Sequence, residues 1–156
     1  MTMTLGPIHD VVVKDLVVHP DDRGRLFEVL RRDDPHFREF GQAYVTTTYP
    51  GVVKAWHRHQ NQDDYFCCLV GMVKLVIHDD RPDSATRGAT QEVWLGDTKL
   101  RLVVVPRGTW HGWKCVSERE AMILNLVTTP YDPRAPDEER LSAHGALPYD
   151  WARRDG

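Results

Sequence analysis

The chain has 156 residues and a formal net charge of -3, with 41% hydrophobic and 28% charged residues. This length and composition are typical of one globular domain with its own core. The charge gives no general reason to expect nucleic-acid binding, and no apolar run approaches the length of a membrane span. The first residues lack a basic start followed by a long apolar segment, so we expect a cytoplasmic protein without a secretory signal.

Short β-prone runs dominate the chain as far as Thr128. Clusters of Gly, Pro, Asp and Asn separate most of them, and no segment keeps a helical period over three turns. Many short strands with turn signals between them predict an all-β sandwich or barrel. The predicted strands are Val11–Val18, Leu26–Leu30, Gln42–Tyr49, Val52–His59, Tyr65–Val70, Met72–His78, Gln91–Leu95, Leu100–Val105, Trp110–Cys115 and Ala121–Thr128.

Two segments differ from this β pattern. Asp33–Phe40 begins with an acidic N-cap and has Pro35 in its first turn, which predicts one short helix. After Pro130 the chain is polar and rich in proline, which predicts a surface tail over residues 130–156 with a helical turn at Pro136–Leu141. Because no repeat or linker interrupts the chain, we expect residues 1–156 to form a single domain.

The most informative stretch is Gly51–Gly71, with the sequence GVVKAWHRHQNQDDYFCCLVG. His57 and His59 are two residues apart, so on a strand they point to the same face. If that face is the inside of a small barrel, Asp64 and the downstream His111 can join them in one pocket. Such a set suits acid–base chemistry or a divalent metal such as Zn, Fe, Mn or Ni, and Asp63 competes with Asp64 for the carboxylate position.

The stretch Gly51–Gly71 and the downstream segment that contains His111 resemble the two motifs of the cupin β-barrels. This resemblance implies an all-β cupin fold (double-stranded β-helix or jelly-roll barrel). From about Val17 to Trp151 the chain also resembles the dTDP-4-dehydrorhamnose 3,5-epimerase family, which acts on nucleotide-linked 4-keto sugars and requires no cofactor. The segments that carry this resemblance are Asp22-Arg23-Gly24 with Phe27-Glu28, Gln42 through His57, Asp79–Thr86, Pro106–Trp113 and Thr128–Pro133.

The resemblance implies roles for individual residues. His57 matches the base that removes protons from carbons beside the keto group. The positions that match the lining of the nucleotide-sugar pocket are Arg23, Glu28, Gln42, Lys54, His111 and Tyr131. Trp113 lies two residues after His111 and is a candidate for stacking on the ligand. The resemblance also implies a homodimer, with Val11–Val18 as the candidate for strand exchange.

Several positions depart from the family's pattern. Asn125 stands where the family has a Tyr that returns a proton, and an amide cannot act as a general acid. Asp64 falls on the family's Lys, Lys54 replaces an Arg, and the Asp that pairs with the family's base has no evident counterpart before Gly156. Because Asn125 interrupts an apolar run, we expect it to face the pocket.

The sequence therefore predicts an isomerase that epimerises a dTDP-linked 4-keto-6-deoxy sugar, with at most one stereocentre changed or with water returning the proton. One alternative is a metal-dependent cupin enzyme whose ligands are His57, His59, Asp64 and His111. Another is a non-catalytic sugar-binding cupin.

Overall fold

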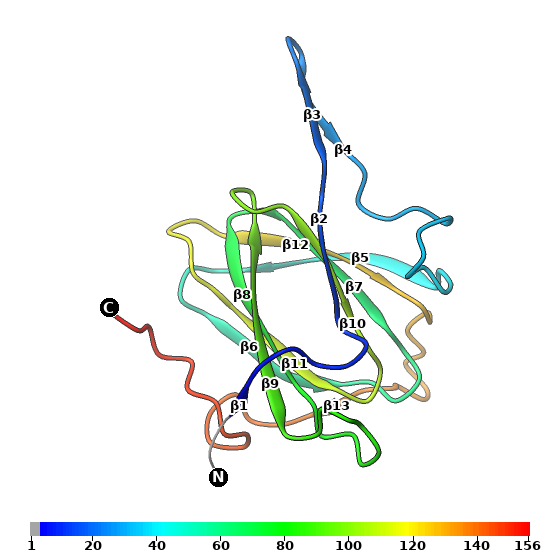
Figure 1. The fold of residues 1–156 in the computed structure, drawn as a ribbon, viewed down its shortest axis with the longest axis vertical. Coiled ribbons are helices and arrows are strands. Elements are labelled where there is room, and N and C mark those ends of the chain that lie inside the picture. The colour runs from blue at the N-terminus through cyan, green and yellow to red at the C-terminus, as the bar shows by residue number, and fades with distance from the viewer. Residues whose placement is uncertain (1–3) are drawn as a thin grey trace.

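A computed structural model describes residues 4–156, which form two β-sheets packed face to face and one projecting hairpin (Figure 1). The first sheet has the order β1 (Thr4–Leu5), β9 (Ala89–Gly96), β8 (Met72–His78), β11 (Trp110–Cys115), β6 (Val53–Arg58) and β13 (Glu139–Arg140). The second has the order β2 (Val12–Asp15), β10 (Arg101–Val105), β7 (Asp64–Val70), β12 (Ala121–Val127) and β5 (Gln42–Thr48). The hairpin consists of β3 (Val18–Asp21) and β4 (Gly24–Phe27).

All pairings between neighbouring strands are antiparallel except that of β1 with β9. Strand β12 shows the alternation that sets the inner face, because Ala121, Ile123, Asn125 and Val127 are buried while the residues between them are partly exposed. The apolar residues of the two inner faces form one continuous core. The all-β cupin prediction is therefore confirmed.

The three cysteines are buried free thiols. Burial raises the pKa of Cys67 to about 11 and, with nearby Cys67 as a smaller cause, that of Cys68 to about 12. Among residues 4–156 no helix has the length and apolar character needed to span a membrane.

The predicted helix at Asp33–Phe40 is wrong. The segment contains single turns, in which the amides of Asp34 and Phe37 bond to the carbonyls of Arg31 and Asp34. An isolated helix of eight residues is marginal, because few backbone bonds offset the cost of starting it. The segment instead packs against the barrel, where the Arg38 amide donates to the Tyr65 hydroxyl.

The predicted helical turn at Pro136–Leu141 is also wrong, because Glu139–Arg140 forms β13 and pairs with β6. The rest of the segment after Pro130 lies against the barrel. Tyr149 and Trp151 are buried and contact Trp56, with ring centroids 6.0 and 5.1 Å from it. The polar segment therefore covers part of the outer face of the six-stranded sheet as well as contributing surface.

The predicted strand Val11–Val18 is divided in the structure. Its first part forms β2, which pairs with β10 of the same chain, and its end begins β3. The β3–β4 hairpin projects from the barrel, as Figure 1 shows. It therefore lacks a neighbouring sheet strand within the described part of the chain.

Candidate functional site

An inner cavity of about 160 Å³ lies between the two sheets, and β6 brings both motif histidines to it. The pairing of β6 with β11 places His57 directly opposite His111, which explains why two motifs far apart in sequence meet at one place. The cavity is lined by Tyr44, Thr46, Lys54, His57, His59, Phe66, His111, Trp113 and Glu138.

His57 lies against aromatic groups, with ring centroids 6.0 Å from both His111 and Trp113. Burial, followed by the electrostatic influence of nearby His111, lowers the pKa of His57 to about 4. The imidazole is therefore neutral near pH 7, the state in which it can accept a proton.

Asp64 is 1% exposed and lines neither cavity itself, but it contacts two histidines of the site. Its Oδ2 lies 3.3 Å from His111 Nε2 and 3.7 Å from His59 Nε2, and its Oδ1 accepts a hydrogen bond from Gln62 at 2.7 Å. Burial alone disfavours the charged carboxylate, but the contacts with His111, His59 and Gln62 outweigh it and hold the pKa of Asp64 below its usual value. Asp64 is therefore an ionised carboxylate.

Candidate ligand atoms of His59, Asp64 and His111 lie within 4.8 Å of one another, so three of the four predicted metal ligands converge. His57 lies outside this cluster. Asp63 does not compete with Asp64, because its carboxylate bonds to the backbone and side chain of Arg107 instead.

His59 is held by the segment that follows β12. Its Nδ1 lies 2.6 Å from the carbonyl oxygen of Asp137, which can only accept, so Nδ1 carries a proton. The Asp137 carboxylate accepts hydrogen bonds from the amides of Gln60 and Asn61, which follow the histidine pair. The polar tail thus fixes the orientation of one histidine.

Asn125 is fully buried and points into the barrel, toward the site. Its Nδ2 lies 2.7 Å from the Tyr44 hydroxyl and 3.4 Å from Asp64 Oδ2. Tyr44 reaches Asn125 because the two residues are direct partners in the pairing of β5 with β12. Asn125 itself lines neither cavity, whereas its partner Tyr44 lines both.

Lys54 and Trp113 line the same inner cavity and are fixed by strand β5. Lys54 Nζ donates to Thr46 Oγ1 at 3.1 Å and to the Thr47 carbonyl at 2.6 Å. Trp113 Nε1 donates to Thr48 Oγ1 at 2.9 Å, which leaves the ring to face His57. The cavity therefore places the Lys54 ammonium group and the Trp113 ring on the same wall as the His57 imidazole.

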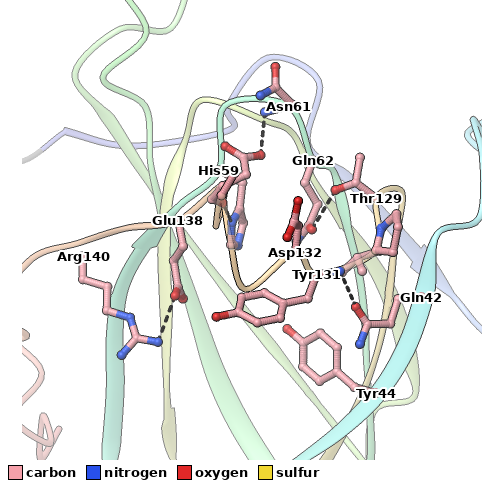
Figure 2. A pocket seen from close by; sticks show the side chains of 14 residues that line it. Gln42, Tyr44, His59, Asn61, Gln62, Thr129, Tyr131, Asp132, Glu138 and Arg140 are labelled. Carbon is pink, nitrogen blue, oxygen red and sulfur yellow. Dashed lines mark hydrogen bonds and ion pairs between the residues drawn. The ribbon is translucent and has the colours of Figure 1, made fainter.

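A wider outer cavity of about 510 Å³ adjoins the inner one and shares Tyr44, His59 and Glu138 with it. Figure 2 shows the rings of Tyr44 and Tyr131 projecting into this space. Gln42 accepts a hydrogen bond from the Tyr131 amide, so both of these predicted pocket residues line the outer cavity. Its volume lies in the range usual for small-molecule sites.

The structure does not bring Arg23 and Glu28 to the site, although both were predicted to line the pocket. Arg23 lies in the turn of the β3–β4 hairpin, where its exposed side chain pairs with Asp21. Glu28 follows β4 and contacts Arg31. Both predictions fail within a single chain because the hairpin projects from the barrel rather than folding over its opening.

Sequence reasoning missed Tyr44, Asp137 and Glu138. Tyr44 lies in a predicted strand whose face toward the barrel was not assigned, and its pairing with Asn125 could be found only from the register of β5 and β12. The two acidic residues lie in the segment interpreted as a surface tail. Glu138 lines both cavities and is a carboxylate near His57. In the sequence alone, the acidic residue that pairs with the family's base has no evident counterpart.

Comparisons with known proteins agree with this architecture. The family model for dTDP-4-dehydrorhamnose 3,5-epimerase matches residues 6–152. The chain is 42% identical over 145 residues to "Probable low-salt glycan biosynthesis epimerase Agl13" of Haloferax volcanii, covering 92% of this chain and 89% of that protein. It is 39% identical over 134 residues to "Spore coat polysaccharide biosynthesis protein SpsL" of Bacillus subtilis, covering 86% and 89%.

Solved structures show the same relationship. A dTDP sugar isomerase from Desulfovibrio desulfuricans G20 superposes with a TM-score of 0.88 at 29% identity, covering 95% of this chain and 94% of that chain. The 4-keto-6-deoxy sugar epimerase NovW of Streptomyces spheroides superposes with a TM-score of 0.84 at 26% identity, covering 98% and 80%. The family resemblance is confirmed: this chain belongs to the dTDP-4-dehydrorhamnose 3,5-epimerase family and is an enzyme of the sugar-epimerase class.

Proposed function

We propose that the enzyme epimerises a carbon beside the keto group of a nucleotide-linked 4-keto-6-deoxy sugar, with His57 as the general base. The observation that carries this proposal is a partly buried imidazole on the wall of the inner cavity, which adjoins an outer cavity large enough for a small-molecule ligand. A neutral imidazole can take a proton from carbon when nearby donors stabilise the enolate that forms.

The remaining cavity residues fit the other parts of such a substrate. Lys54 supplies a cation beside His57, suited to the enolate oxygen or to a diphosphate. Trp113 offers a ring for the sugar, and Gln42 and Tyr131 line the wider space that the nucleotide would occupy. The names of two similar proteins, a dTDP sugar isomerase and a 4-keto-6-deoxy sugar epimerase, support this substrate class.

The test is product analysis with dTDP-4-keto-6-deoxyglucose. Borohydride reduction after incubation converts the keto sugars into stable alcohols, whose epimers can be separated and identified. We expect epimerised product from the parent protein and a loss of roughly 10²-fold or more in His57→Asn. His144→Asn, at an exposed position in the tail, is the matched control. Equal product from parent and His57→Asn would exclude His57 as the base.

A second candidate function, a metal-dependent reaction, is favoured by one observation. The proton on His59 Nδ1 leaves Nε2 of the neutral ring with a lone pair, and that atom lies 3.7 Å from an ionised carboxylate. A cation bound between these two acceptor atoms would contact both of them. Two imidazoles and a carboxylate suit a divalent transition metal, and the Asp137 carbonyl would orient His59 as an outer contact of the metal.

Elemental analysis of protein purified without a metal-affinity tag separates these two candidates. The metal reading predicts about one Zn, Fe or Mn per chain, lost in His59→Ala and kept in His144→Ala. A metal-to-protein ratio near zero after reloading with each metal would exclude the metal-dependent reaction and leave the epimerase proposal in place.

We also propose that two chains form a homodimer through the β3–β4 hairpin. The hairpin and its base expose Val17 and Leu26, with 69% and 62% of their surfaces accessible, which supports burial against a second copy.

A further inference from the structure

The two walls of the inner cavity belong to different sheets. His57 lies on β6 in the six-stranded sheet, while Tyr44 lies on β5 in the five-stranded sheet. Both side chains line the same cavity of about 160 Å³. A sugar ring held between them would therefore meet an imidazole on one face and a phenol on the other. Epimerisation requires that a proton leave one face of the carbon and that a proton return to the opposite face, and groups on these two walls could perform the two transfers.

Hydrogen bonding fixes the direction in which the Tyr44 hydroxyl can donate. Asn125 Nδ2, which can only donate, lies 3.4 Å from Asp64 Oδ2. The same nitrogen then donates to the Tyr44 oxygen at 2.7 Å. Within residues 4–156 the Tyr44 hydroxyl has no other partner, so its own proton is available to a ligand.

On this geometry we propose that Tyr44 is the general acid of the reaction, supplying from β5 the phenol that is absent at position 125. The inference rests on the proposed function. Asn125 acts as a positioning residue that holds the phenol oxygen and turns its proton toward the cavity. The fully buried Asp64 in turn orients Asn125, so a chain of three residues sets the donor in place.

His57 takes the proton from the carbon beside the ketone, and the electron pair of the broken C–H bond forms the enolate. The enolate carbon then takes the proton of the Tyr44 hydroxyl from the opposite face, which restores the ketone and leaves a phenolate. Solvent protonates the phenolate and removes the proton from the imidazolium, so both groups return to their starting states.

The ionisation of Tyr44 agrees with this role. Burial, followed by the negative charge of Asp64, raises the pKa of Tyr44 to about 12, so the phenol carries its proton near pH 7. The hydrogen bond from Asn125 acts in the opposite direction and stabilises the phenolate formed after the transfer.

Tyr131 is the competing phenol, and its position disfavours it. It lines the outer cavity but not the inner cavity that contains His57, and it is 63% exposed. Figure 2 shows both rings in the outer cavity. Of the two, Tyr44 alone also lines the inner cavity.

The test separates proton removal from inversion. Parent and variants are incubated with dTDP-4-keto-6-deoxyglucose in D₂O, and mass spectrometry measures deuterium incorporation while product analysis measures the epimer. In Tyr44→Phe we expect epimer formation to fall by about 10²-fold or more, because a positioned general acid contributes that much. Deuterium incorporation should remain within several-fold of the parent, because His57 can still remove a proton and return a deuteron to the same face.

The controls address the other phenols and the fold. Tyr49→Phe, at an exposed site just after β5, should match the parent in both assays. Tyr131→Phe should keep the ratio of epimer to deuterium incorporation even if it weakens binding. Thermal unfolding and dTDP binding, measured for each variant, show whether the protein remains folded and able to bind.

Three results would overturn the inference. Epimer formation at the parent rate in Tyr44→Phe would do so while leaving the proposed function intact. A selective loss of epimer in Tyr131→Phe would assign the acid to Tyr131. If the parent itself incorporated no deuterium, the proposed function would fail, and the role of Tyr44 would fail with it.

Discussion

Asp79 illustrates how a single buried charge organises a loop. The residue is fully buried, and its carboxylate accepts hydrogen bonds from Arg81, Ser84 and Thr86. Burial alone would disfavour the charge, but these bonds outweigh it and hold the pKa of Asp79 well below its usual value of 3.8. The segment Asp79–Thr86, which resembles a family motif, thus stabilises a loop and lies apart from both cavities.

We predict that Asp79→Asn lowers the free energy of unfolding at pH 7 by about 1–3 kcal/mol, because it weakens a buried charged network. Asp80→Asn, its more exposed neighbour, should change little. The folded pKa of Asp79 is lowered, so its stabilising contribution is present above about pH 4 and is lost as pH falls below that value. Urea unfolding at several pH values checks this, and equal losses for both variants would contradict it.

At the scale of single residues, strand parity predicted that His57 and His59 would share a face, and the resemblance to the two cupin motifs predicted that His111 would join them. The spacing of two residues puts the first pair on one face, and a barrel brings His111 to them. Tyr44 and Glu138 could not be predicted in this way. Their places depend on which strands are neighbours and on how the tail folds back, and neither is encoded in local periodicity.

At the scale of elements, the pairing of β5 with β12 determines which side chains form the wall of the inner cavity that contains Tyr44. Tyr44 and Asn125 are direct partners in this ladder, so the phenol and the amide that holds it lie side by side. The sequence suggests that Asn125→Tyr would restore a phenol. In the structure Asn125 is fully buried beside Tyr44, so this substitution alone would force two phenols into one place.

We therefore predict that Asn125→Tyr destabilises the protein by about 1–3 kcal/mol through overpacking. The exchange Tyr44→Asn with Asn125→Tyr should recover most of that stability and more epimer formation than Tyr44→Asn alone. Thermal unfolding and epimer assays of the four proteins form a double-mutant cycle. Additive effects, with no coupling between the two positions, would contradict a shared site.

The elements themselves were largely predictable. All ten predicted strands overlap observed strands, because alternating apolar residues and turn clusters mark them locally. The two helical predictions fail because capping residues occur in turns as well as in helices. Strands β1 and β13 have two residues each and owe their form to the neighbouring β9 and β6, so no local pattern could reveal them.

At the scale of the whole molecule, the projecting β3–β4 hairpin pairs with neither of the two larger sheets. If two copies pair there, light scattering should give a mass about twice the 18.0 kDa of one chain. Leu26→Asp should shift the protein toward monomer, because it places a charge in the proposed contact. Leu141→Asp, in the tail, serves as the control. A monomeric parent at all concentrations would contradict the homodimer.

The proposed function and the proposed role of Tyr44 both depend on removal of a carbon-bound proton by His57. The most direct measurement is proton NMR of dTDP-4-keto-6-deoxyglucose in D₂O, following the signals of the hydrogens on the carbons flanking the ketone. We predict that the parent protein removes at least one of these signals by exchange. In His57→Asn the loss of signal should be slower by roughly 10²-fold or more. Retention of both signals with the parent protein, or equal loss with His57→Asn, would contradict it.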